Sequence, residues 1–228
     1  MDWLTEFPEL GRRDMRDFRK AIDQGFKDFT RTYGEDIEGF FEPLLQFLIW
    51  LEKLLLATPW PLFILIVAAL AWFASRSLKI VIGSSISLFF IGFLGMWEDT
   101  MSTVSIILVC TMLCIGLGLP IGILMSRSDR AQAIVTPILD VMQTIPSFVY
   151  LIPVVMLLGI GKVPGLISVV IYAIPPMIRL TNLGIRLVDK EVLEAADAFG
   201  ASPWQKLTQV QIPLALPNIF AGVNQTIM

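Results

Sequence analysis

The sequence predicts an all-α fold: a polytopic bundle of transmembrane helices with an N-terminal amphipathic helical extension. Composition is the first observation, because 55% of the 228 residues are hydrophobic and only 16% are charged, whereas soluble domains carry about 25% charged residues. The second is that the apolar residues gather in runs of membrane-spanning length, with a mean hydropathy of +0.73 over the chain. The net charge of −3, without a long basic run, argues against nucleic acid as a partner.

Residues 1–57 form the first predicted segment, a tail with two helical patterns. Apolar residues recur at spacings of 3, 4, 4 and 3, which predicts one stripe of an amphipathic helix made by Met15, Phe18, Ile22, Phe26 and Phe29. Residues 40–56 are apolar but interrupted by polar and charged side chains. We expect them to form an interfacial helix that lies along the membrane or against the protein, and not a span.

Residues 58–98 are predicted to hold the first two transmembrane helices, and residues 99–228 a helical core. A crossing takes about 20 mostly apolar residues, and five runs qualify: residues 54–74, 80–97, 103–125, 145–160 and 163–178. The last two runs contain prolines, which predict kinks or broken helices.

A sixth apolar run begins near Ile219 and covers about half a crossing by Met228. We therefore expect the bundle to be truncated at its C-terminus. Within the third run, Gly116, Gly118 and Gly122 have a small-residue spacing that suits close helix contact.

Basic residues in the short connections predict the orientation. The connections at 75–79, 126–144 and 179–217 together hold eight Lys and Arg, whereas the opposite connections hold only Lys162. The positive-inside rule places the first set in the cytoplasm. Five spans then leave residues 1–53 outside, because most basic residues of the tail lie too far from the first span to count.

Enzymatic and metal chemistry find little support. The chain has no histidine, which removes the commonest general base and the commonest zinc ligand. Cys110 and Cys114 share one helical face, where disulfide geometry is unfavourable and two thiolates alone make no zinc site. Around Gly161-Lys162, Met156 and Val163 stand where a P-loop needs Gly and Ser or Thr. We expect no catalytic residue, no metal and no cofactor bound by this chain.

The loop at residues 186–217 predicts two short helices. Residues 192–199 favour a helix that Gly200 can end in the left-handed conformation. Ser202 then offers an N-cap oxygen and Pro203 fits the first helical position.

The second helix is expected over residues 204–210, with Pro213 limiting its extension. About 30 ordered residues exceed an ordinary connection between helices. A helix–turn–helix on the positive side of a membrane bundle indicates a docking element, and its few basic residues argue against DNA binding.

This loop resembles the EAA motif of ABC importer permeases in Glu194-Ala195-Ala196, Gly200 and Val210-x-Ile212-Pro213. The resemblance to the glycine betaine/proline betaine/choline branch covers residues 99–228 and is weaker from Phe40 to there, with no specific match in 1–39. It is carried by GLPIGIL from 118, LDVMQTIP from 139, FVYLIP from 148, LGIG from 158, IPP from 174, RLTNLGIR from 179 and GVNQTIM from 222. The family continues through further helices beyond the position of Met228.

The resemblance implies the type I importer fold and a permease in the bacterial cytoplasmic (inner) membrane. It implies an ABC ATPase dimer, which would bind ATP and Mg and receive the coupling helices of this loop in a groove. A second permease copy in a homodimer, an external or periplasmic substrate-binding protein and membrane lipid complete the implied partners. The residues that it implies in ATPase coupling are Glu194, Ala195, Ala196, Gly200, Ala201, Ser202, Pro203 and Pro213.

Polar and aromatic residues of the apolar runs are candidates for the transport pathway. Polar side chains within a membrane usually face a bundle interior or water, and a quaternary ammonium cargo favours aromatic faces. Helix packing is the alternative for each of them. The candidates are Gln143, Thr144, Ser147, Phe148, Tyr150 and Tyr172, with Asp140 on the same segment as the first of these.

An ion-gradient-driven secondary transporter is the alternative function. Such proteins often show inverted repeats and charged residues near the bilayer midplane. This sequence shows no internal repeat, and its predicted spans are almost free of charge. The sequence therefore favours transport powered by a separate ATPase.

Overall fold

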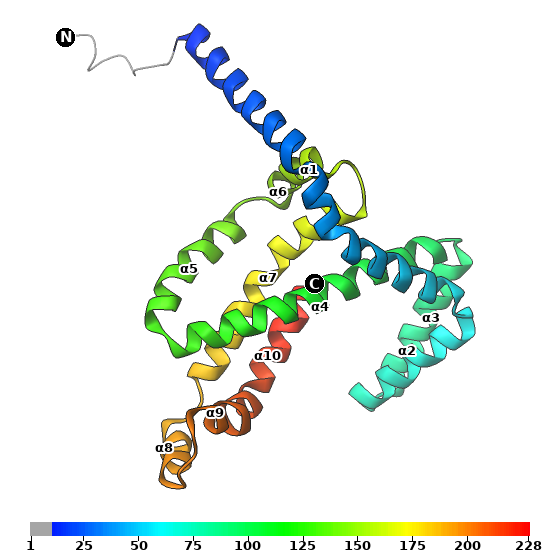
Figure 1. Cartoon of the computed structure of the whole chain (residues 1–228). Coiled ribbons are helices and arrows are strands. Elements are labelled where there is room, and N and C mark those ends of the chain that lie inside the picture. Colours follow the sequence, from blue (N-terminus) through cyan, green and yellow to red (C-terminus); the bar gives the residue numbers. More distant parts are fainter. Residues whose placement is uncertain (1–10) are drawn as a thin grey trace, which may run out of the picture.

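The computed structural model describes residues 11–228, which are almost entirely helical and contain no strand. The helices are α1 (Arg12–Ala57), α2 (Trp60–Ser75), α3 (Leu78–Phe93), α4 (Trp97–Arg127), α5 (Asp129–Thr144), α6 (Ser147–Leu158), α7 (Lys162–Arg186), α8 (Lys190–Ala198), α9 (Pro203–Gln205), a π-helical segment (Lys206–Gln211) and α10 (Ile212–Ile227). The all-α fold class is confirmed. Figure 1 shows α4, α7 and α10 together at the centre, with α1 projecting from one end of the bundle and α8 and α9 from the other.

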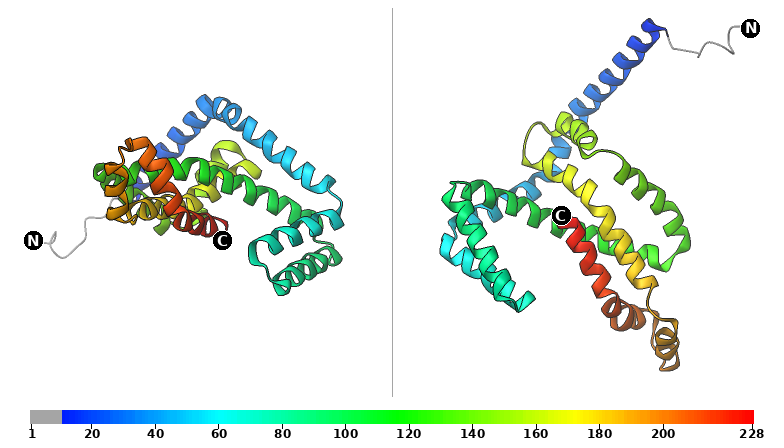
Figure 2. Two further views of the ribbon diagram at one scale, coloured as in Figure 1. Left: turned by 90° about the horizontal axis from the view of Figure 1, so that it is seen from below. Right: turned by 180° about the vertical axis from the view of Figure 1, so that it is seen from behind.

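Two helices, α4 and α7, are each long and apolar enough to cross a membrane. Two bent pairs, α1 with α2 and α5 with α6, satisfy the same test only when both members are taken together, and α3 is a shorter apolar helix. The α2–α3 hairpin stands to one side of α7 and α10 in both views of Figure 2. It has no buried residue of its own.

The centre of the bundle is the crossing of α4 and α7, where small residues let the two backbones approach. A Cβ atom on Gly118 would lie 2.9 Å from the Met177 side chain, and one on Gly122 would lie 2.6 Å from Thr181 Cβ. Close packing of this kind drives helix association in a membrane, where burial of apolar surface provides no driving force between helices. The predicted contact is confirmed for Gly118 and Gly122, whereas Gly116 has no neighbour within 4 Å.

Helix α10 packs on α7 beside α4 by the same means. A Cβ atom on Gly184 would lie 2.7 Å from Asn218 Cβ, and one on Gly222 would lie 3.3 Å from the Met177 backbone. The buried Thr226 hydroxyl donates to the carbonyl oxygen of Ala173 across the same interface, at 3.3 Å. Helix α7 is thus the central helix, packed against both α4 and α10.

The predicted span at residues 145–160 forms only the 12-residue helix α6, and the broken helix expected from its prolines is confirmed. The structure has two helices, α5 and α6, that meet at an angle of 91°. The break falls at Ile145, which is extended with ψ 126°, because the ring of a following proline, here Pro146, disfavours the helical conformation. Helix α5, expected as a cytoplasmic loop, runs back along the bundle, and α6 lies at the end of the bundle next to α1 (Figure 1).

The tail forms one continuous helix of 46 residues in place of two separate pieces. Its last turns pack against α4, α6 and α7, with Leu48 and Leu51 buried. It ends at Ala57 and turns by 102° into α2, because Pro59 excludes the helical conformation from Thr58. Residues 40–56 pack against the protein, as one of the two expected placements had it, and the apolar run predicted from residue 54 begins its own helix at Trp60.

Proline does not break α7. Pro175 and Pro176 lie inside a helix that runs without interruption to Arg186, so the break expected there is wrong. Neighbouring helices tolerate proline in a membrane helix by packing around it, and Pro175 is fully buried in this bundle. As a result Arg179, expected in the cytoplasmic loop, belongs to the helix.

Candidate functional site

The first helix of the predicted docking loop is α8, and its two ends are capped by local chemistry. The Asp189 carboxylate accepts a hydrogen bond from the Glu191 backbone N–H at 3.0 Å, which satisfies one of the free donors of the first turn. At the other end Gly200 has φ +77°. The Gly200 N–H donates to the Asp197 carbonyl and the Ala201 N–H to the Ala196 carbonyl, which is the Schellman arrangement expected of a glycine that ends a helix.

The second helix starts at a complete capping box. The Ser202 hydroxyl accepts from the Gln205 N–H at 3.3 Å, and the Gln205 side chain accepts from the Ser202 N–H at 2.8 Å. Pro203 occupies the first position, where its missing N–H costs nothing. The predicted roles of Gly200, Ser202 and Pro203 in forming the turn are therefore confirmed.

Pro213 does not end the second helix, contrary to prediction. The helix passes through the π-helical segment Lys206–Gln211 directly into α10. A π-turn widens the helix and changes the hydrogen-bond register, which removes the clash that a proline ring makes with the carbonyl four residues earlier. The loop that is predicted to dock a partner is consequently joined to α10 by a continuous helical backbone.

The two loop helices are held to each other and to the bundle. Lys206 Nζ lies 2.5 Å and 2.7 Å from the two carboxylate oxygens of Asp197. Leu207 is buried in a cluster with Ile185, Ala215 and Ile219. The loop is therefore connected to both α7 and α10.

The exposed face of this loop carries the EAA residues. Glu194 and Ala195 are exposed and Ala196 is half-buried, and no hydrogen bond or ion pair engages the Glu194 side chain within residues 11–228. Sequence analysis missed two large aromatic residues on the same loop: Phe199 is 93% exposed and Trp204 is 67% exposed. The sequence could have singled them out, because contact with lipid does not explain bulky aromatic residues in a polar loop.

Arg186 fixes the junction between α7 and this loop. Its guanidinium donates to the Met125 carbonyl at 2.8 Å and to the Asn182 side chain at 3.1 Å, and it lies 2.8 Å from the Asp129 carboxylate. The inner ends of α4, α5 and α7 are thereby joined through one side chain.

A cavity of about 820 Å³ lies between α4, α5, α7 and the end of α10, and we call it the central cavity. Two pathway candidates, Gln143 and Tyr172, line it. Its polar wall also includes Thr103, Cys110, Gln225 and Thr226.

The other four pathway candidates lie at the bend between α5 and α6. The Tyr150 hydroxyl donates to the Met142 carbonyl at 3.0 Å and the Thr144 hydroxyl to the Val141 carbonyl at 3.1 Å. Ser147 begins α6, and Phe148 is 75% exposed on it. None of these four lines the central cavity.

An ion pair lies about one helical turn from two residues that line the central cavity, Gln143 and Pro176. Arg179 of α7 donates through Nη2 to the carboxylate of Asp140 on α5. Sequence analysis missed this pair, because it placed Arg179 in a loop and treated residues 126–144 as a connection. The signal that could have found it is the apolar periodicity of α7, which continues past Arg179 to Ile185.

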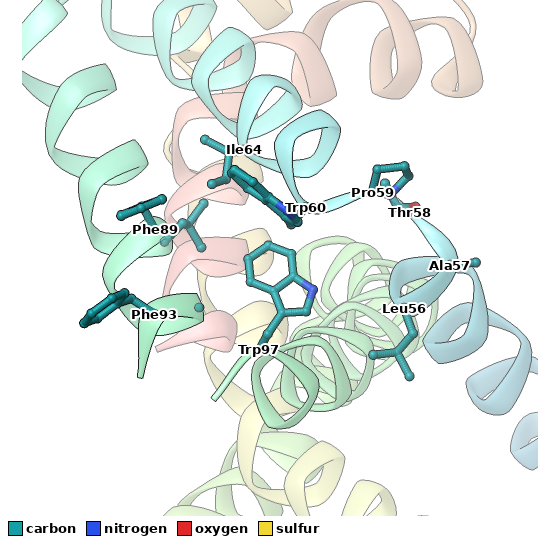
Figure 3. A pocket seen from close by; sticks show the side chains of 11 residues that line it. Leu56, Ala57, Thr58, Pro59, Trp60, Ile64, Phe89, Phe93 and Trp97 are labelled. Carbon is teal, nitrogen blue, oxygen red and sulfur yellow. The ribbon is translucent and has the colours of Figure 1, made fainter. Parts of the chain in front are cut away.

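A second cavity, of about 480 Å³, is lined almost wholly by apolar and aromatic residues where α1 meets α2. Figure 3 shows the rings of Trp60 and Trp97 reaching toward a shared space, with Phe89 on the neighbouring wall. Trp side chains gather where a membrane meets water.

The described residues hold no group of three or more His, Cys, Asp or Glu side chains that could bind a metal ion. Cys110 and Cys114 are free and buried in the α4–α7 interface. Both side chains pack between the two helices.

A bundle of apolar helices with a capped, protruding loop at its basic end defines a multi-pass integral membrane protein. Residues 114–228 match the family described as the inner membrane component of binding-protein-dependent transport systems. The chain belongs to this family and is a multi-pass protein of the bacterial inner membrane.

Three similar proteins support this assignment. Over its whole length the chain is 47% identical to the glycine betaine/proline betaine transport system permease protein ProW of Escherichia coli (strain K12), of which it covers 67%. Over 76% of its length it is 45% identical to the glycine betaine/carnitine transport permease protein GbuB of Listeria monocytogenes serotype 1/2a (strain 10403S), covering 62% of that protein. Over 91% of its length it is 41% identical to the glycine betaine transport system permease protein OpuAB of Bacillus subtilis (strain 168), covering 73%.

These relatives are permease proteins of transport systems. The comparisons thus favour the predicted permease over the alternative of an ion-gradient-driven secondary transporter. The chain spans about two thirds of the length of the relatives that it matches.

Proposed function

We propose that this chain is the membrane permease subunit of an ATP-driven ABC importer for a quaternary ammonium compatible solute of the glycine betaine, proline betaine or choline type. The observation that carries the proposal is the docking loop, a capped pair of helices in continuous helical connection with α10. The cargo class rests on the relatives, whose names include glycine betaine, proline betaine and carnitine.

The energy source is an ATPase dimer on the cytoplasmic side, which binds the loop in a groove. Glu194, Ala195 and Ala196 lie on one side of the turn, and Gly200, Ala201, Ser202, Pro203 and Pro213 shape its backbone or follow it. Closure of the ATPase dimer on ATP favours one conformation of the permease over the other only if the two conformations bind the ATPase differently. The firm link from the loop into α7 and α10 supports such differential binding.

Two further partners complete the proposal. A second copy of the permease supplies the other wall of the pathway, and a substrate-binding protein delivers the solute from outside. Gln143 and Tyr172, with the other candidates Thr144, Ser147, Phe148 and Tyr150, are proposed to face the pathway. Aromatic rings attract quaternary ammonium groups by cation–π interaction.

The test is uptake of glycine betaine into liposomes that contain the full-length permease with its ATPase, supplied with the loaded binding protein. Glu194→Ala and Gly200→Val should abolish stimulated uptake while the permease still inserts in the membrane, and Glu98→Gln at the opposite end of α4 serves as the matched control. Uptake that proceeds without an ATPase and stops with a protonophore would contradict the proposal. Unchanged uptake in both loop variants would remove the coupling role.

A further inference from the structure

The Asp140–Arg179 ion pair lies in a part of the bundle where charges are costly. Arg179 is seven residues before the inner end of α7, which corresponds to about 10 Å along the helix axis. Asp140 is eleven residues after the start of α5, which corresponds to about 16 Å. Both residues therefore lie about two helical turns or more inside the inner ends of their helices, and ionisable side chains within a membrane bundle are tolerated only beside water or a partner.

The pair is not sealed inside the protein. The side chain of Arg179 is 38% exposed and that of Asp140 is 57% exposed. Charges with this exposure cannot face hydrocarbon, so the surface that α5 and α7 present here must face water or another polar surface. The ion pair thus marks a side of the bundle that does not face lipid.

Helical spacing puts the pair directly below the central cavity. Asp140 is three residues before Gln143 on α5, and Arg179 is three residues after Pro176 on α7, and both Gln143 and Pro176 line the cavity. Residues three apart share a helix face. Side chains tilt toward the N-terminus of their own helix, so Asp140 tilts inward and Arg179 outward on these antiparallel helices, and they meet at the inner floor of the cavity.

The arginine has hydrogen-bonding capacity that the pair does not use. Its Nη2 donates to one oxygen of Asp140, while its Nε is buried and has no partner within the part of the chain that the structure describes. A guanidinium has five N–H donors and suits a carboxylate in a bidentate arrangement. The buried Nε cannot be reached by a cargo, but the side chain is 38% exposed, so the exposed end of the guanidinium can bind a second carboxylate in place of, or beside, Asp140.

We propose that Asp140 and Arg179 form a charged subsite on which a zwitterionic cargo exchanges partners with the ion pair. The inference rests on the proposed function and specifies its cargo chemistry. The carboxylate of the cargo binds Arg179, and its quaternary ammonium group lies against Asp140 and the ring of Tyr172, two helical turns above Arg179. A bound zwitterion and the ion pair together make two pairs of opposite charges where the empty subsite has one. The exchange therefore adds no net charge within the membrane.

The test is uptake of glycine betaine by the complete transporter in liposomes, with the double variant Asp140→Asn/Arg179→Gln. Loss of charged hydrogen bonds to the cargo should lower uptake by roughly tenfold or more, while ATP hydrolysis stimulated by the loaded binding protein stays within about twofold of the wild type. A pair that only braced α5 to α7 would instead lower ATP hydrolysis together with uptake in the assembled complex. The control Glu52→Gln/Lys162→Gln removes an ion pair at the outer end and should leave uptake unchanged.

The outcomes separate this inference from the proposed function. Uptake that survives in the double variant overturns the inference alone, whereas absence of ATP-dependent uptake in the wild type overturns the proposed function and the inference with it. If the double variant does not assemble, Arg179→Lys decides. It preserves the charge but loses the bidentate geometry, so the inference requires uptake that is reduced at unchanged ATP hydrolysis, and unchanged uptake overturns it.

Discussion

Lys162 Nζ lies 2.6 Å and 2.5 Å from the two carboxylate oxygens of Glu52, although the two residues are 110 positions apart in the chain. The same ammonium group lies 3.4 Å from the Ser102 hydroxyl. One side chain at the start of α7 thus joins the end of α1 to the start of α4. Since Lys162 lies at the end of the bundle opposite the docking loop, the contact holds the last turns of α1 at the outer end.

The Glu52–Lys162 pair predicts a pH-dependent contribution to stability. The hydrogen bond from Lys162 lowers the pKa of Glu52 from its ordinary value of 4.5, against a smaller opposing effect of burial. A carboxyl whose pKa is lowered on folding contributes stability above its unfolded pKa and loses it as the pH falls through the folded value. The melting temperature of Glu52→Gln should therefore be lower than that of the wild type at neutral pH, and the difference should vanish at acid pH.

The control for this prediction is Lys53→Gln, because Lys53 is an exposed neighbour on the same helix. Its melting temperature should match the wild type throughout the pH range. A difference for Glu52→Gln that persists unchanged at acid pH would show that the pair is not its cause.

Gly122→Ala should destabilise the α4–α7 crossing. The new methyl group would lie 2.6 Å from Thr181 Cβ and 2.8 Å from the Ile178 carbonyl oxygen, and neither atom belongs to the end of a flexible side chain. Overpacking of this kind costs about 1–3 kcal/mol. Gly116→Ala is the matched control, since nothing lies within 4 Å of its Cβ position, and alanine in a helix interior is about 0.5–1 kcal/mol better than glycine.

Both glycine variants can be compared by thermal unfolding in detergent. The expected order of melting temperature is Gly122→Ala below wild type and Gly116→Ala at or above it. Equal melting temperatures for the two variants would mean that the helices separate easily at this contact.

Ser202→Ala should loosen the second helix of the docking loop. It removes the hydroxyl that accepts from the Gln205 N–H, and loss of an N-cap costs about 1 kcal/mol. Amide hydrogen exchange over residues 204–207 should accelerate about fivefold, which is the factor that corresponds to about 1 kcal/mol. Thr208→Ala is the control, because its hydroxyl only donates back to the Trp204 carbonyl at 2.9 Å, and its exchange should be unchanged.

Phe199→Ala should weaken association with the ATPase without unfolding the loop. An aromatic side chain that is 93% exposed contributes little to the fold of this subunit. Truncation of an aromatic anchor residue at an interface lowers the binding free energy by about 2 kcal/mol or more. This corresponds to a Kd about 30-fold higher. A binding titration of the ATPase against the permease in lipid nanodiscs measures this change.

The control for Phe199 is Phe93→Ala, a 78% exposed residue at the end of α3 remote from the loop. Its Kd for the ATPase should equal that of the wild type. If Phe199→Ala also binds as tightly as the wild type, the ATPase contacts another face of the loop.

The sequence by itself determined the features that depend on neighbours along the chain. The all-α membrane class follows from composition, and the turn at Gly200 to Pro203 follows from residues whose preferences act within one helical turn. Family motifs in residues 99–228 likewise sufficed to indicate a permease. These inferences required no knowledge of what each helix touches.

Only the tertiary structure decided the features that depend on contacts between helices. Pro175 and Pro176 remain helical because α4 and α10 pack around α7, and Pro213 is accommodated by a π-turn that no local preference specified. Apolar runs alone could not show that α5 runs along the bundle while α6 turns aside. The pairing of Asp140 with Arg179 depends on two helices lying antiparallel at close range, so the charged floor of the central cavity exists only in the folded bundle.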